Sequence, residues 1–150
     1  MRLVAIVAAV SFMAATPSLA LDQNDATTPI SAAGEAEVAR LTEPFFGSLK
    51  AADATKAYAD LFKGTLLESK TVEVAQLATQ TNFVLQTYGA VSSWELASSE
   101  CMTDYICKLV YVVRLDKGPV AFWIYAYRQP TGAWQPTYVL LGDSPQFFFK

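Results

Sequence analysis

Aromatic rings and phenol hydroxyls are the most concentrated chemical groups of this chain, and most of them lie after residue 100. A row of rings with a few hydroxyls suits small, flat or apolar ligands. The alternative is that the same rings pack in the core or in a seam between two copies. We favour packing, because aromatic residues in strands are ordinarily packing residues. The residues predicted to line a ligand pocket are Tyr111, Trp123, Tyr125, Tyr127, Trp134 and Tyr138.

Groups able to transfer protons are few. The chain has no histidine, which is the commonest acid or base of enzymes. Glu95 and Asp60 remain, but Glu95 alternates with serines and Asp60 lies beside an apolar helical stripe, so both are expected to face solvent. Nucleophile-elbow, P-loop, dinucleotide-binding and zinc-binding spacings are all missing. We therefore predict no catalytic residue, no metal and no cofactor.

The first twenty residues resemble a secretory signal peptide. Arg2 precedes an apolar run over residues 3–15, and Ser18-Leu19-Ala20 has the small-x-small pattern of a cleavage site. An uncleaved anchor is disfavoured because the apolar run is shorter than the roughly 20 residues that a spanning helix needs. We predict cleavage after Ala20 and a periplasmic or secreted protein.

An exported location bears on the two cysteines. Cys101 and Cys107 flank a predicted turn, so a disulfide across the end of a hairpin is geometrically reasonable. A metal-binding or redox pair is disfavoured, because the chain lacks histidine and any C-x-x-C motif. We predict a structural disulfide.

Charge excludes two classes of partner. Loss of Arg2 with the signal peptide takes the net charge from −3 to −4, and neither sign is clustered. Binding to nucleic acid or to an anionic membrane surface is therefore not expected. Residues 21–30 are polar and lack periodicity, which predicts a flexible leader before a single domain over residues 31–150.

Hydrophobic periodicity predicts the elements that carry these groups. Spacings of three and four predict helices over residues 32–52, 54–63 and 72–88, with a kink or restart at Pro44. Asp53 and Thr71 are the expected N-caps, and Gly89 ends the third helix. Strands are expected over residues 90–101, 105–115, 120–128 and 134–141. This order predicts an α+β fold, with three helices on one face of a four-stranded antiparallel sheet.

Both faces of the predicted sheet are apolar along their middles, whereas an isolated antiparallel sheet usually has one polar face. Residues 105–115 and 120–128 alternate so that neither side is consistently polar. The second face must be covered by a partner chain, a ligand or the chain's own tail. The run Phe147-Phe148-Phe149 is one candidate cover, because three exposed phenylalanines would favour aggregation. A second copy is another, so we predict a homodimer.

Several local signals resemble the NTF2-like (cystatin-like cone) superfamily over about residues 34–148. They are Leu49-Lys50-Ala51-Ala52-Asp53 before the second helix, Thr87-Tyr88-Gly89-Ala90-Val91 before the first strand, and Gly132-Ala133-Trp134 before the last strand. The resemblance implies a curved sheet that wraps the helices into a cone, often with a pocket at its open end. It also implies that dimers through the outer sheet face are frequent.

The function expected from these observations is an exported, non-enzymatic module that binds a small apolar or aromatic ligand or a protein partner. The alternative is an isomerase- or dehydratase-like enzyme that uses a pocket carboxylate and tyrosines, as enzymes of this fold usually place an acid or base inside the cone.

Overall fold

The computed structural model describes residues 31–148, and the signal peptide and leader predicted over residues 1–30 lie outside the described residues. Three helices, α1 (Ala32–Lys50), α2 (Ala54–Phe62) and α3 (Thr71–Tyr88), precede four strands. The strands are β1 (Val91–Thr103), β2 (Ile106–Leu115), β3 (Gly118–Arg128) and β4 (Trp134–Gly142). A short 3₁₀ turn, η1 (Leu66–Ser69), lies between α2 and α3, and a second, η2 (Pro145–Phe147), follows β4. The predicted α+β class is confirmed.

Helix α1 runs without interruption through Pro44, so the predicted restart does not occur. Proline cannot donate to the carbonyl of Arg40, and both residues are exposed, which leaves that carbonyl to water. Ser31 caps the helix by accepting a hydrogen bond from the Gly34 N–H at 3.2 Å. The buried face includes Thr42, whereas Leu41, whose spacing from Val38 and Phe45 predicts the same helix face as theirs, is 37 % exposed.

The ends of α2 and α3 differ in how well their first N–H groups are satisfied. Asp53 caps α2 as predicted, accepting from the Lys56 N–H at 2.9 Å. The predicted N-cap of α3 is wrong, because Thr71 is already helical and Lys70 precedes it without a side-chain cap.

Gly89 ends α3 at a φ of 92°, and a Cβ there would lie 2.5 Å from an oxygen of Asp116. That carboxylate accepts from the Ala90 N–H, so the close approach joins α3 to the sheet.

The four strands form one antiparallel sheet in the order β1-β2-β3-β4, so β1 and β4 are its edges. Tyr111 pairs with Phe122 and Leu109 with Ile124, and these side chains share the concave face. Val110 pairs with Trp123 and Lys108 with Tyr125, and alternation places these side chains on the outer face.

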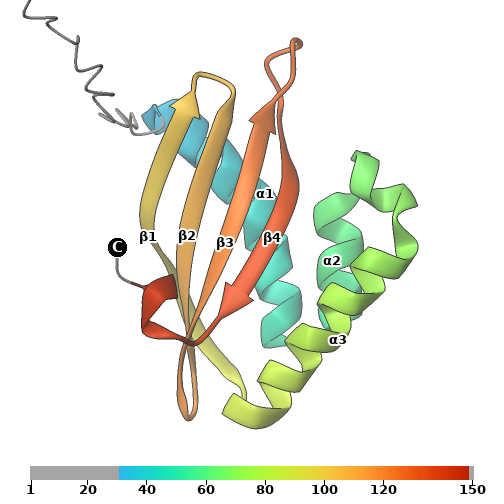
Figure 1. The fold of residues 1–150 in the computed structure, drawn as a ribbon, viewed down its shortest axis with the longest axis vertical. Coiled ribbons are helices and arrows are strands. Elements are labelled where there is room, and N and C mark those ends of the chain that lie inside the picture. Colours follow the sequence, from blue (N-terminus) through green and yellow to red (C-terminus); the bar gives the residue numbers. More distant parts are fainter. Residues whose placement is uncertain (1–30, 149–150) are drawn as a thin grey trace, which may run out of the picture.

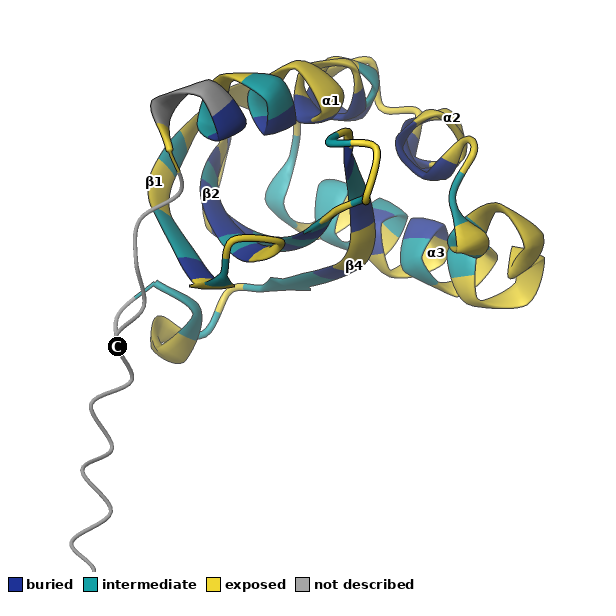
Figure 2. Ribbon diagram, turned by 90° about the horizontal axis from the view of Figure 1, so that it is seen from above, coloured by how far each residue is buried: buried dark blue, intermediate teal, exposed yellow. Residues whose placement is uncertain are grey.

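Helix α1 crosses the concave face, around which the sheet curves, while α2 and α3 lie alongside the β4 edge (Figures 1 and 2). Helix α3 packs chiefly on α2 rather than on the sheet. The expectation that all three helices cover one face is therefore corrected. Only α1 covers the centre of the sheet, because α2 and α3 pair with one another and extend the layer sideways.

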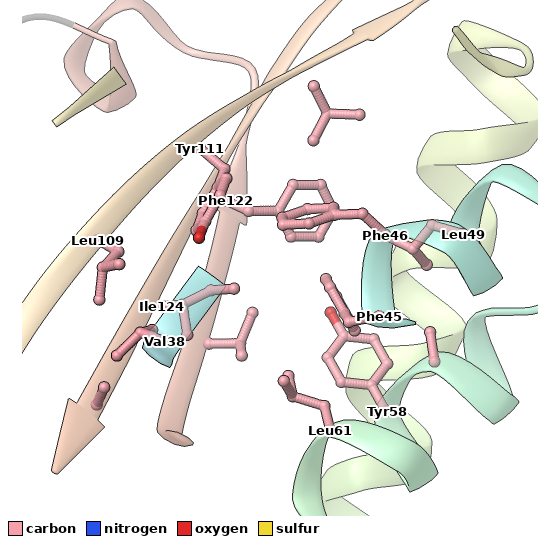
Figure 3. Close-up of a cluster of buried hydrophobic side chains, with 14 of the residues drawn as sticks. Val38, Phe45, Phe46, Leu49, Tyr58, Leu61, Leu109, Tyr111, Phe122 and Ile124 are labelled. Carbon is pink, nitrogen blue, oxygen red and sulfur yellow. The ribbon is translucent and has the colours of Figure 1, made fainter. Parts of the chain in front are cut away.

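An aromatic cluster fills the space between α1 and the concave face (Figure 3). The ring of Phe46 lies 4.8 Å from that of Tyr111 and 5.8 Å from that of Phe122, and Phe45 lies 5.1 Å from Tyr58. All five rings are at most 4 % exposed. Edge-to-face contacts of this kind stabilise beyond the burial of area alone.

Two hydroxyls within this core have partners on neighbouring helices. The Tyr58 hydroxyl lies 2.9 Å from that of Thr81 on α3, and burial raises the pKa of Tyr58 far above its ordinary value. The Tyr111 hydroxyl lies 2.8 Å from that of Thr42 on α1. Burial also raises the pKa of Tyr111, although the hydrogen bond with Thr42 opposes the shift. In each pair, the two hydroxyls satisfy one another and would otherwise be buried without a hydrogen-bond partner.

The predicted disulfide is present. Cys101 on β1 and Cys107 on β2 are directly paired, with Cα atoms 4.0 Å apart, and both are buried. The bridge holds the end of the hairpin on which Met102, Tyr105 and Ile106 are exposed. Across residues 31–148, we find no helix with both the length and the apolar character needed to cross a membrane.

The C-terminal tail folds onto the outer face, on the side of the sheet opposite α1 (Figure 2). The indole Nε1 of Trp123 donates to the Phe147 carbonyl at 3.0 Å, and the two rings lie 5.2 Å apart. Gly142 permits this contact, because a Cβ there would lie 2.5 Å from the Phe147 ring. A partner chain, a ligand and the chain's own tail were the three expected ways of covering the second face. The tail covers part of that face. Phe149 lies outside the described residues.

The hydroxyl of Tyr58 generates a prediction about alkaline stability. We expect Tyr58→Phe to be about 1 kcal/mol less stable than the wild type near pH 8, because Thr81 loses its partner. The wild type should lose stability above about pH 10, where tyrosine ionises in the unfolded chain while burial keeps the phenol protonated in the fold. This loss approaches about 1.4 kcal/mol per pH unit, so the stability difference should shrink and reverse. Urea denaturation between pH 8 and pH 12 measures it.

Tyr138→Phe is the matched control, because it removes an exposed hydroxyl. Its stability difference from the wild type should stay near zero up to pH 10. A Tyr58→Phe difference that stays constant up to pH 12 would mean that this phenol ionises as easily in the fold as outside it.

The docked tail generates a second prediction. We expect Phe147→Ala to destabilise the protein by about 1–2 kcal/mol, because a half-buried ring leaves Trp123, and to shift tryptophan emission to longer wavelength. Gly142→Ala should have a similar effect, because its methyl group would displace the same ring. The double variant should cost little more than either single variant. Denaturant titrations followed by fluorescence test this, with Gln146→Ala as the control; fully additive effects would contradict the shared contact.

Candidate binding surface on the outer sheet face

The register between β2 and β3 divides the six predicted ligand-binding residues between the two faces of the sheet. Tyr111 and Trp134 belong to the buried core. Trp123, Tyr125 and Tyr127 alternate with the core residues of β3, and Tyr138 pairs with Tyr125 on β4. The six residues therefore do not form one wall, because neighbouring positions on a strand face opposite sides.

The two inward residues of this set have structural partners. Tyr111 contacts Thr42 and Phe46 on α1, as described above. Trp134 is 8 % exposed, and its main-chain N–H donates to a carboxylate oxygen of Glu37 on α1 at 3.5 Å. Their contacts join the sheet to α1 and leave the rings no open surface of their own. The concave side is packed at this point rather than hollow (Figure 3).

The outward rings gather toward the end of the sheet that carries the β1–β2 and β3–β4 turns. The rings of Tyr105 and Tyr127 lie 6.3 Å apart, and those of Tyr125 and Tyr138 lie 6.0 Å apart. Tyr105 and Tyr138 are each 52 % exposed. We call this surface the tyrosine patch and define it as Tyr105, Ile106, Tyr125, Tyr127 and Tyr138.

Charge beside the tyrosine patch is neutralised within the chain. The Lys108 ammonium lies 3.1 Å from a carboxylate oxygen of Glu100, and it also lies 5.1 Å from the centre of the Trp123 ring. Both charged side chains are largely shielded from solvent. A partner covering this surface would therefore bury a paired cation and anion rather than a lone charge, which avoids the main electrostatic cost of burial.

The hollows outside the packed core of residues 31–148 include a shallow one of about 710 Å³ along α3 and three that lie between elements. Of these three, one of about 220 Å³ lies between the tail and the outer face, and Trp123 and Phe147 line it. A second of about 390 Å³ lies between α2 and α3, over Phe62 and Ala78. The third, of about 480 Å³, separates α3 from β4. The first is smaller than the roughly 300–1,000 Å³ usual for ligand sites, and the other two fall inside that range.

The carboxylates considered for proton transfer lie outside these aromatic surroundings. Glu95 is exposed on β1. Asp60 is exposed on α2 and forms an ion pair with Lys56 one turn away. The buried phenols of Tyr58 and Tyr111 have raised pKa values, which disfavours loss of their protons. Among residues 31–148, no three potential metal-ligating side chains of His, Cys, Asp or Glu come together.

Sequence reasoning did not select Tyr105, Ile106 or Thr42. Tyr105 lies in the turn between β1 and β2, and Ile106 is the first residue of β2. Ile106 pairs with Tyr127 on β3, so alternation from Tyr127 across the β2–β3 pair was the available signal for Ile106. Thr42 could have been selected by its spacing from Val38 and Phe45 on the same helical face.

Comparison of the chain with protein-family models, with curated proteins and with solved structures finds no match.

Proposed function

We propose that this chain is an exported, non-catalytic interaction module that binds a second copy of itself through the tyrosine patch. The observation that supports this proposal most is a cluster of half-exposed rings on the outer sheet face, beside the ion pair of Lys108 and Glu100. Tyrosine is enriched at protein interfaces because it buries a large rigid area while its hydroxyl remains hydrogen-bonded.

The choice of a second copy rests on symmetry and charge. A two-fold axis through the patch would stack the tyrosines of one copy on those of the other, and none of the side chains that define the patch is an acidic or basic residue, although each chain is acidic overall. The resemblance to the NTF2-like cone superfamily favours the same arrangement, since dimers through the outer sheet face are frequent there. The packed concave side favours an external surface over a cone pocket.

A small aromatic or apolar ligand is the second candidate, because Trp123 and Phe147 line a hollow at the edge of the same face. Its volume of about 220 Å³ limits such a ligand to a small molecule. The tyrosine patch offers a larger surface, so self-association is the preferred function. The enzymatic alternative has less support, because neither candidate carboxylate lies in an aromatic pocket.

The proposed interaction takes place outside the cytoplasm, because the chain is proposed to be exported. The pattern of Arg2, the apolar run and Ala20 supports removal of the first twenty residues. The Cys101–Cys107 bridge is compatible with an oxidising compartment. Oxidation would also hold the hairpin that presents Tyr105 and Ile106, so the compartment and the proposed interface are linked.

Self-association generates a direct prediction. The protein at tens of micromolar should elute with a light-scattering mass twice that of one chain. We expect Tyr127→Lys to weaken the dimer about tenfold or more, because it places two charges near the two-fold axis of the interface. Size-exclusion chromatography with light scattering over a dilution series measures the dissociation constant.

The matched control is Phe83→Lys, which adds the same charge at an exposed aromatic residue on α3. It should leave the mass unchanged. A wild-type protein that remains a monomer at millimolar concentration, or a dimer that Tyr127→Lys does not weaken, would contradict the proposed function.

Processing generates a separate prediction. When the full chain is expressed in a bacterium with a functional secretion system, the periplasmic fraction should contain protein that begins at Leu21 and carries the disulfide. Intact mass and N-terminal sequencing measure both features. Ala20→Arg should block cleavage, because the cleavage site requires a small residue. Recovery of the wild type in the cytoplasm with Met1 retained would contradict export.

A further inference from the structure

A groove of about 480 Å³ runs between α3 and the free edge of the sheet. One wall is formed by residues 137–141 of β4, and the other by the face of α3 that carries Glu73, Leu77 and Gln80. Five consecutive strand residues line this groove. Successive side chains of a strand point to opposite faces of the sheet. Five consecutive residues can therefore line one groove only if the groove runs along the edge of the strand.

The edge of β4 carries main-chain groups that need a partner. Its inner edge pairs with β3, and no strand among residues 31–148 pairs with its outer edge. Every second residue of an edge strand directs its N–H and C=O away from the sheet. Proteins usually protect such an edge, because it serves as a template for another extended chain. Here α3 stands beside the edge without pairing with it.

The α3 wall is apolar at its base and polar at its rim. Val74, Leu77 and Leu141 are partly buried against the core, so they present apolar surface to the groove. Gln76 and Gln80 are exposed above them. A strand that entered the groove would direct one set of alternate side chains toward the apolar base and the other toward the glutamines and water.

We propose that this groove binds an extended peptide segment of a partner protein, which adds to β4 as a fifth, terminal strand. Main-chain hydrogen bonds along residues 137–141 would supply the common part of recognition, and apolar side chains at alternate positions would contact Leu77 and Leu141. The charged groups lining the groove are one lysine, Lys70, and one glutamate, Glu73, so an uncharged segment suits it. This proposal goes beyond self-association through the tyrosine patch and does not depend on it.

The position of α3 beside β4 favours a single extended strand over a second folded copy as the occupant of the groove. Pairing β4 with the β4 of another copy would bring the two α3 helices toward the same space, because each stands alongside its own β4 edge (Figure 1). A single extended segment has no flanking helix and fits between the walls. The occupant is therefore a peptide segment rather than a second sheet.

The test uses a synthetic pool of peptides of about eight residues, which is a typical strand length. Positions alternate between Val, Ile, Leu or Tyr and Thr or Ser, with a lysine and a dye at one end. We expect saturable binding to the wild-type protein by fluorescence anisotropy. A second pool that carries N-methyl groups at alternate amides should bind about tenfold more weakly or not at all, because it cannot complete the main-chain ladder.

Gln80→Trp is the blocking variant, since it places a large ring at the groove while replacing an exposed residue. Gln86→Trp is the matched control on an exposed position of the same helix. We expect about a tenfold loss of peptide affinity for Gln80→Trp and none for Gln86→Trp. Tyr138 is left unchanged, because it belongs to both the groove and the tyrosine patch.

Three results would overturn the proposal. The first is the absence of saturable binding by the unmethylated pool. The second is equal binding by the methylated pool, which would identify the groove as a site for apolar side chains or small molecules only. The third is equal affinity of Gln80→Trp and the wild type. Light scattering on the same samples reports the dimer separately, so failure here is distinguishable from failure of the tyrosine-patch interface.

Discussion

Phe46 lies between Tyr111 and Phe122 at the middle of the concave face, and this aromatic contact limits what the rest of the molecule can do. Burial of the three rings holds α1 across the sheet and occupies the space in which a cone pocket would otherwise form. The Thr42–Tyr111 hydrogen bond satisfies the one polar group in this contact and joins the same two elements. With the concave side filled, unsatisfied surface remains on the outer face and along the β4 edge. Binding is therefore expected at those two places.

Most of the fold could be predicted from the sequence, because over long segments the hydrophobic periodicity agrees with the residues that end helices and form turns. The apolar stripe from Val74 to Tyr88, which ends before Gly89, predicted α3, and alternation over 105–115 and 120–128 predicted the central strands. The errors came from tertiary context. Helix α1 continues through Pro44, which lies on the exposed side of the helix, and Thr42 rather than Leu41 packs against the sheet. The lateral position of α3 depends on its packing against α2, which a single-helix pattern does not encode.

The candidate site was less predictable, since it depends on register. Aromatic content drew attention to β2 and β3, but separating Tyr111 from Trp123 required knowing that Tyr111 pairs with Phe122. The doubly apolar sheet indicated that a second cover was needed, and Phe147 on Trp123 supplies part of it. The β4 groove left no sequence signal of its own, because it arises from the gap between two elements that are each ordinary in pattern.

Nitration of tyrosines by tetranitromethane, mapped by mass spectrometry across a range of protein concentrations, tests the division of roles between the two faces most directly. The reactivity of Tyr105, Tyr125 and Tyr127 should fall as concentration rises, because the proposed dimer covers their rings. Tyr58 and Tyr111 should remain unreactive throughout, since the aromatic core encloses them. A reactive Tyr111, or outer tyrosines whose reactivity is independent of concentration, would contradict a filled concave face with an outward binding surface.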